Sequence, residues 1–183
     1  MRIIVEGLDC VGKTTIAKYL SETLNIPYYK IKRTVSKIGT QQEVTQRIID
    51  ETSLVLADWN GVLDRGYFSA LATGLCYEKN LDYSRLVRLD NLRPDLSIIV
   101  TSNIDAIRKR TRRSFSNQDK RILGGGLFEK VQDWMINTIS NESYYHLKND
   151  FKNYDELKNS LDKCVNYINE NIVKYKYINE AIL

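Results

Sequence analysis

The sequence predicts an α/β fold in which helices cover both faces of a parallel sheet. Short apolar segments alternate along the chain with longer segments of helical periodicity, so consecutive strands are joined by helical crossovers. Such crossovers join parallel strands, whereas antiparallel strands can be joined by tight turns. In addition, a glycine-rich turn follows the first strand, at the edge of the sheet where proteins of this class bind ligands.

Each predicted strand is a short run of mainly apolar residues. The strands comprise 2–6, 27–32, 61–64, 96–101 and 144–147. The longer segments between the strands are predicted helices, and in the first of them Ile16, Ala17, Leu20 and Leu24 recur at helical spacing. The helices comprise 13–24, 42–59, 67–79, 82–91, 104–113, 126–139 and 154–172. We expect Asn25 to cap the end of the first helix, and both prolines to precede a strand.

Length and composition indicate one globular domain that spans residues 1–183. The hydrophobic content of 43% is sufficient for a sizeable core. A net charge of +4 fits an anionic small ligand and is modest for a nucleic-acid binder. No apolar run approaches the ~20 residues of a membrane span, and the N-terminus lacks the pattern of a signal peptide. We therefore expect a cytoplasmic protein that binds neither nucleic acid nor membrane.

The cysteines and the one histidine indicate no metal site. Cys10, Cys76 and Cys164 are widely spaced, and no pair has the spacing of metal ligands. We expect them to be thiols in a reducing compartment. His146 lies in the last predicted strand, and we expect it to be structural.

The segment GLDCVGKT at 7–14 fits the phosphate-binding pattern G-x-x-x-x-G-K-[ST], the P-loop. Its glycines let the backbone curl around an anion, so that the amides point inward and the helix that follows adds the positive end of its dipole. Lys13 supplies a mobile charge for the β- and γ-phosphates, and the Thr14 hydroxyl can ligate Mg²⁺. The residues predicted to hold the nucleotide phosphates are Gly7, Asp9, Cys10, Val11, Gly12, Lys13, Thr14 and Thr15.

A P-loop enzyme needs a carboxylate near its magnesium ion, usually at the end of a neighbouring strand. The strand 61–64 ends in Asp64, and Arg65 follows directly. Asp64 is therefore the candidate metal-side carboxylate, and Arg65 would lie near the transferred phosphoryl group. The alternatives are that Asp64 caps the helix that follows and that Arg65 is a solvated surface residue.

Taken together, the segments IIVEGLDCVGKTTIAKYL and VLDRGYFSALATG resemble the thymidylate kinase family of P-loop nucleoside monophosphate kinases. RPDLSIIV resembles the P-D-L strand of that family. RTRR, QDKR and GLFEKVQDW resemble its lid arginines and the helix after the lid. The matching segments cover roughly half of the chain, between residue 2 and about 135.

The resemblance implies a three-layer P-loop fold with a five-stranded parallel sheet, and phosphoryl transfer from ATP, with Mg²⁺, to a deoxynucleoside monophosphate. By position, Asp9 would contact the 3′-hydroxyl of the acceptor deoxyribose, and Arg65 would bridge the acceptor phosphate and ATP. Arg110 and Arg113 would be lid residues near the ATP phosphates or the adenine. The variable P-loop position is not basic here, so the lid would have to supply the arginine.

The chain also departs from the family pattern. Gly66 and Thr73 stand where the pattern has tyrosines. In the helix that would stack on thymine, Val55 replaces the phenylalanine and Trp59 the arginine. The phosphate-binding segments therefore match better than the base pocket, and dTMP is the leading acceptor by resemblance alone.

The charges after the second strand separate two acceptors that the same fold can use. A nucleoside 5′-hydroxyl must lose a proton, so nucleoside kinases place a carboxylate base there, whereas a monophosphate needs cations. The segment YYKIKRT offers Lys30, Lys32 and Arg33, and no acidic residue occurs between Tyr28 and Glu43. Arg33 is our candidate for the acceptor phosphate, because the family binds that phosphate with an arginine in this region. A deoxynucleoside kinase remains the alternative.

The segment RKRTRRSFSNQDKRILGGG predicts a small mobile lid at about 109–126, with Gly124–Gly126 as its hinge. A closed lid would exclude water, which competes for the γ-phosphoryl group. The alternative is a solvated basic helix and loop.

A non-kinase ATPase or GTPase is the alternative function of another class, although the guanine-reading N-K-x-D sequence is absent. The helix 67–79 could form a homodimer interface, as dimers are common in the family.

Overall fold

The computed structural model describes residues 1–31, 59–66, 68–69, 94–110, 127–139 and 144–173, and the structural statements below refer to these residues. Several predicted segments lie wholly or largely outside them. These are the helices 42–59, 67–79 and 82–91, the proposed dimer interface and all of the lid beyond Arg110. Of the helix predicted at 42–59, only Trp59 is described, and it is not helical.

The five predicted strands form one parallel sheet, as expected. They are β1 (Arg2–Glu6), β2 (Tyr28–Lys30), β3 (Gly61–Asp64), β4 (Leu96–Thr101) and β5 (Tyr144–Lys148). Their order across the sheet is β2-β3-β1-β4-β5, and every neighbouring pair is parallel. The predicted α/β fold class with a five-stranded sheet is therefore confirmed.

Strand β1 lies in the middle of the sheet, and its apolar side chains are sealed from solvent. Ile3, Ile4 and Val5 are each 0% exposed, as expected for a strand covered on both faces. Val5 is opposite Asp64 of β3, and Glu6 is opposite Ile99 of β4. The residues that follow β1 therefore emerge between the carboxyl ends of β3 and β4.

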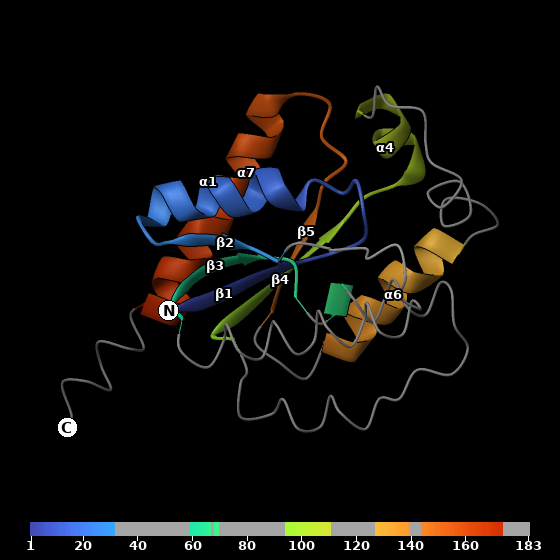
Figure 1. The fold of residues 1–183 in the computed structure, drawn as a ribbon. Coiled ribbons are helices and arrows are strands. Elements are labelled where there is room, and N and C mark those ends of the chain that lie inside the picture. Colours follow the sequence, from blue (N-terminus) through green and yellow to red (C-terminus); the bar gives the residue numbers. More distant parts are fainter. Residues whose placement is uncertain (32–58, 67, 70–93, 111–126, 140–143, 174–183) are drawn as a thin grey trace, which may run out of the picture.

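The helices lie on both sides of the sheet (Figure 1). Helices α1 (Lys13–Leu24) and α7 (Tyr154–Ile168) pack together on one face, and α6 (Leu127–Ile139) covers β4 from the other. Helix α4 (Ile104–Arg110) follows β4, and a π-helical turn, η3 (Asn169–Val173), extends α7. Asn25 ends α1 in a left-handed conformation and donates its N–H to the carbonyls of Ser21 and Glu22, so the predicted cap is confirmed.

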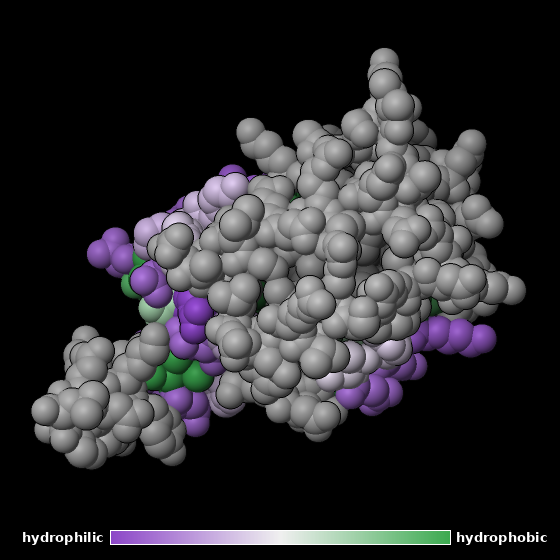
Figure 2. Space-filling view, turned by 60° about the horizontal axis from the view of Figure 1, so that its bottom comes forward, coloured by the Kyte–Doolittle hydropathy of each residue, from purple (hydrophilic) through white to green (hydrophobic). Residues whose placement is uncertain are grey.

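Helical periodicity accounts for the packing of the C-terminal helix. The buried residues of α7 are Leu161, Cys164, Val165 and Ile168, which lie on one side of the helix. On the face shown in Figure 2, the described residues that reach the surface are mostly hydrophilic, with a few small hydrophobic areas. In the described parts of the chain, no helix has the length and apolar character needed to cross a membrane.

Candidate active site

The loop after β1 folds into a tight cradle through three residues with positive φ. These are Gly7 (151°), Cys10 (68°) and Gly12 (99°). A Cβ on Gly7 would lie 2.4 Å from the Val100 carbonyl oxygen, and one on Gly12 would lie 2.5 Å from Nδ2 of Asn149. Both glycines of the sequence pattern are therefore required by space as well as by backbone conformation.

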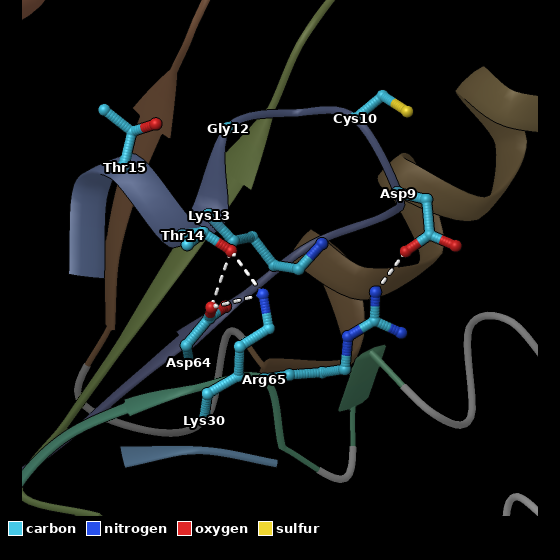
Figure 3. Close-up of a pocket in the computed structure, with 9 residues that line it drawn as sticks. All are labelled: Asp9, Cys10, Gly12, Lys13, Thr14, Thr15, Lys30, Asp64 and Arg65. Atoms are coloured by element: carbon cyan, nitrogen blue, oxygen red, sulfur yellow. Dashed lines mark hydrogen bonds and ion pairs between the residues drawn. The ribbon is translucent and has the colours of Figure 1, made fainter. Parts of the chain in front are cut away.

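The side chain of Lys13 is folded inside this loop (Figure 3). Its Nζ donates to the Leu8 carbonyl at 2.6 Å, and the residue is only 6% exposed. Burial, followed by the nearby positive charge of Arg65, lowers the pKa of Lys13 to about 8, although Asp9, Asp64 and Glu6 act in the opposite direction. The loop thus holds a buried cation that a phosphate group could neutralise.

Asp64 lies at the end of β3, where two hydroxyl groups donate to one carboxylate oxygen and an ammonium group forms an ion pair with it. The Thr14 hydroxyl lies 2.6 Å from Oδ2 of Asp64, the Tyr28 hydroxyl lies at 3.0 Å, and Nζ of Lys30 lies at 3.4 Å. The Lys30 ammonium also donates to Oγ1 of Thr14 at 2.9 Å (Figure 3). Asp64 is 1% exposed. Burial of Tyr28, followed by the negative charge of Asp64 and the hydrogen bond to it, raises the pKa of Tyr28.

Arg65 reaches over the pocket from the residue after β3. Its Nη2 donates to Oδ1 of Asp9 in the P-loop, and this ion pair is partly buried. The backbone of Arg65 has φ = 85°, a conformation that residues other than glycine adopt rarely. The turn therefore places the guanidinium on the side of the pocket away from Thr14 (Figure 3).

These side chains line a pocket of about 230 Å³ at the carboxyl end of the sheet. Its lining contains most of the residues that the sequence predicted, together with Lys30. They are Asp9, Cys10, Gly12, Lys13, Thr14, Thr15, Lys30, Asp64 and Arg65. The other two predicted loop residues, Gly7 and Val11, are buried and do not line the pocket. Arg33 and Arg113 lie outside the described residues, and Arg110 ends α4 with its side chain outside them.

Three further residues support the pocket, although sequence reasoning did not assign them to it. The sequence indicates Lys30 only as part of a basic strand end, whereas the structure has it in the pocket lining, bound to Thr14 and Asp64. The buried amide of Asn149, just after β5, donates from Nδ2 to the Val11 carbonyl at 2.7 Å. The buried carboxylate of Glu6 accepts hydrogen bonds from the backbone of Gly66, Phe68 and Ser69. Only the sheet topology brings these partners together.

The other expectations for single residues concern the cysteines and His146. Cys10 is exposed in the P-loop and Cys164 lies on the buried side of α7, and neither is in a disulfide; Cys76 lies outside the described residues. Nε2 of His146 lies 2.8 Å from Oγ1 of Thr101 on the neighbouring strand, and burial lowers the pKa of this imidazole. This pairing of β4 and β5 agrees with a structural role.

Comparison with known proteins identifies one curated relative at clear sequence similarity. The chain is 31% identical over 140 residues to a "Probable thymidylate kinase" of Archaeoglobus fulgidus, an alignment that covers 62% of this chain and 70% of the relative. No family model matches the chain.

Solved structures confirm the fold. A deoxyadenosine kinase from M. mycoides with bound dCTP matches with a TM-score of 0.67 and 14% identity, over 93% of this chain and all of the other. A thymidylate kinase from Candida albicans matches with a TM-score of 0.57 and 18% identity, over 95% of this chain and 91% of the other. At these identities the likeness concerns architecture, so the acceptor must be argued from the pocket.

Proposed function

We propose that this chain, which belongs to the thymidylate kinase family of P-loop kinases, phosphorylates a deoxynucleoside monophosphate with ATP, and that dTMP is its acceptor. In this reaction an oxygen of the acceptor phosphate forms a bond to the γ-phosphorus of ATP. The bond between that phosphorus and the β,γ-bridging oxygen breaks, and ADP leaves with the electron pair. The products would be dTDP and ADP.

The donor phosphates would lie in the loop 7–14. The backbone amides of the loop and the first turn of α1 would bind the phosphate oxygens. Lys13 would exchange its bond to the Leu8 carbonyl for a γ-phosphate oxygen, which supplies a better partner for a buried ammonium group.

The oxygens of Thr14 and Asp64 fit a magnesium ion, because Mg²⁺ prefers hydroxyl and carboxylate ligands and these two lie in contact. Bound there, the ion would neutralise charge that develops on the β- and γ-phosphates. Asp64 would bind the ion directly or through water, and the Tyr28 hydroxyl would hold the carboxylate in place.

The observation that carries the choice of acceptor is the position of Lys30. It projects into the pocket from the end of β2, where a kinase acting on a nucleoside needs a carboxylate base. The two carboxylates that line the described pocket, Asp9 and Asp64, are each paired with a cation. A pocket lined by the cations of Lys30 and Arg65 suits an acceptor that brings its own negative charge.

The lid arginines, Arg110 and Arg113, and Arg33 complete the proposal. Arg33 would assist Lys30 at the acceptor phosphate, and the lid residues would close over ATP and neutralise the transition state. Asp9 would contact the sugar of the acceptor while keeping Arg65 in place.

An ATP-consumption screen over nucleosides and nucleoside monophosphates tests the acceptor class. We expect turnover with monophosphates, dTMP first, and the variant Lys13→Ala should be folded and inactive. Lys30→Met should raise the KM of the monophosphate about tenfold, because it removes one charge-assisted contact. The matched control Lys158→Met, on the exposed side of α7, should behave as wild type. Phosphorylation of nucleosides only would show that the alternative, a deoxynucleoside kinase, is correct.

A further inference from the structure

Glu6 is a buried carboxylate at the end of β1 that does not line the pocket. It is 0% exposed, yet its oxygens accept the N–H groups of Gly66 (3.1 Å), Phe68 (3.2 Å) and Ser69 (2.9 Å), and the Ser69 hydroxyl as well. Burial raises the pKa of Glu6, while these hydrogen bonds, led by those from Ser69, act against the rise. The group is thus fully hydrogen-bonded in a place where an unpaired carboxylate would be costly.

The partners of Glu6 follow Asp64 and Arg65 directly in the chain. Through these hydrogen bonds the carboxylate fixes the turn after β3. The same cluster reaches the P-loop, because the Gly7 N–H donates to Oγ of Ser69 at 3.0 Å. One buried group therefore connects the first residue of the donor cradle with the turn that carries Arg65.

The turn is fitted closely to this carboxylate. A Cβ on Gly66 would lie 2.5 Å from Oε1 of Glu6 and 2.9 Å from Cγ2 of Ile4. The residue before it, Arg65, has φ = 85° and donates its N–H to the Val5 carbonyl at 3.0 Å. An arginine keeps this uncommon backbone conformation only where neighbouring groups fix it, and Glu6 binds the N–H groups of Gly66, Phe68 and Ser69 just after it.

We propose that Glu6 is a positioning residue for Arg65. By holding the N–H groups of 66, 68 and 69, it sets the turn that aims the guanidinium across the pocket at Asp9 and at the phosphates. This inference rests on the proposed function in one respect, the contact between Arg65 and phosphate. It adds a residue that touches neither substrate and acts on catalysis through another side chain.

A double-mutant cycle separates positioning from a general structural role. Glu6→Gln keeps the size of the side chain but replaces one acceptor oxygen by an amide donor that faces the same N–H groups. Steady-state kinetics are measured with ATP and the best acceptor for the wild type, Glu6→Gln, Arg65→Ala and the double variant. Glu22→Gln, an exposed glutamate of α1, is the matched control and should keep wild-type kinetics.

We expect Glu6→Gln to lower kcat about 100-fold, since a misplacement of about 1 Å can have that effect. Its affinity for a fluorescent ATP analogue should stay within about threefold of wild type, because Lys13 and the loop amides remain. In the Arg65→Ala background, the same change should lower kcat by less than about threefold, because the side chain that it positions is gone.

Full additivity, with the 100-fold loss repeated in the Arg65→Ala background, would show that Glu6 only supports the fold and would overturn the proposal. If Glu6→Gln does not fold, Ser69→Ala serves in the same cycle, because it removes the hydroxyl between Glu6 and the Gly7 N–H. It should then show the same loss of effect beside Arg65→Ala. Wild-type activity of Arg65→Ala would instead refute the role of Arg65, and this inference with it, while leaving the donor site intact.

Discussion

The buried ammonium group of Lys13 should make nucleotide affinity depend on pH. In the free protein its pKa is lowered to about 8 from an ordinary value of 10.5, chiefly by burial. A bound triphosphate would favour the charged form and restore a higher pKa. Raising the pH from 7 to 9 would deprotonate most of the free protein, so the affinity for ATP should fall about tenfold, or about 1.4 kcal/mol.

The assay is a titration with a fluorescent ATP analogue between pH 7 and pH 9.5, at constant ionic strength. Lys13→Arg is the matched control, because an arginine stays charged throughout this range. The ATP affinity of Lys13→Arg should be lower overall, because a guanidinium group is larger than the site that holds the Lys13 ammonium group. This affinity should not vary with pH.

Stability provides a second and opposite readout of the same group. Because the pKa of Lys13 is lower in the folded than in the unfolded chain, the unfolded chain binds more protons between pH 8 and 10.5. Folding stability of the nucleotide-free protein should therefore rise with pH in this window, by up to about 3 kcal/mol relative to Lys13→Arg.

A wild-type affinity for the ATP analogue that is constant from pH 7 to pH 9.5, or one that falls equally in Lys13→Arg, would refute the reasoning.

Two further predictions follow from the site. The exposed thiol of Cys10 should react with iodoacetamide at least about tenfold more slowly under saturating ATP, as read by peptide mass mapping. Cys164, buried and with its pKa raised to about 12, should stay unlabelled in both conditions, and equal labelling of Cys10 with and without ATP would contradict the donor site. Gly66→Ala should lower the free energy of unfolding by about 2 kcal/mol in urea titrations, because its Cβ would collide with Glu6. An unchanged midpoint and slope would contradict that packing.

Local patterns predicted the parts of the site whose residues are close in sequence. The strand 2–6, the turn 7–12 and the helix that starts at Lys13 each follow from spacing and residue type, and the structure has them at those residues. The sequence predicts Asp64 as a metal-side carboxylate because it ends a short buried strand, and the structure has it opposite Val5, next to the P-loop. Its role at the metal stays a prediction.

Partners that are distant in sequence could not be predicted in this way. Glu6 follows apolar strand residues, and nothing near it indicates a hydrogen bond to Ser69, which is 63 residues away. The basic end of β2 was recognised, but its register with β3 decides which side chain faces the pocket. Lys30 pairs with Asp64 in that register. The prediction for Arg33 lies outside the described residues and stays a prediction.

The tyrosine expected at position 66 gives a similar lesson. By resemblance, Gly66 was only a departure from a pattern. The structure supplies a physical reason, because Oε1 of Glu6 and a methyl group of Ile4 occupy the space that any side chain would need. The spacing of motifs cannot reveal such a collision, since it depends on how closely the turn after β3 lies to the side chains of β1.

The amide of Asn149 has a consequence for the order in which this protein becomes competent to bind nucleotide. This side-chain amide donates to the Val11 carbonyl, 138 residues earlier in the chain, and the backbone N–H of Asn149 donates to the Thr101 carbonyl. During synthesis the contact with Val11 cannot form before Asn149 has been made, long after the loop itself. The loop 7–14 would be made early, yet it would lack the hydrogen bond from Asn149 until β5 joins the sheet. Nucleotide binding would therefore report on the last strand to join, and a nascent chain that ends before β5 would hold ATP weakly.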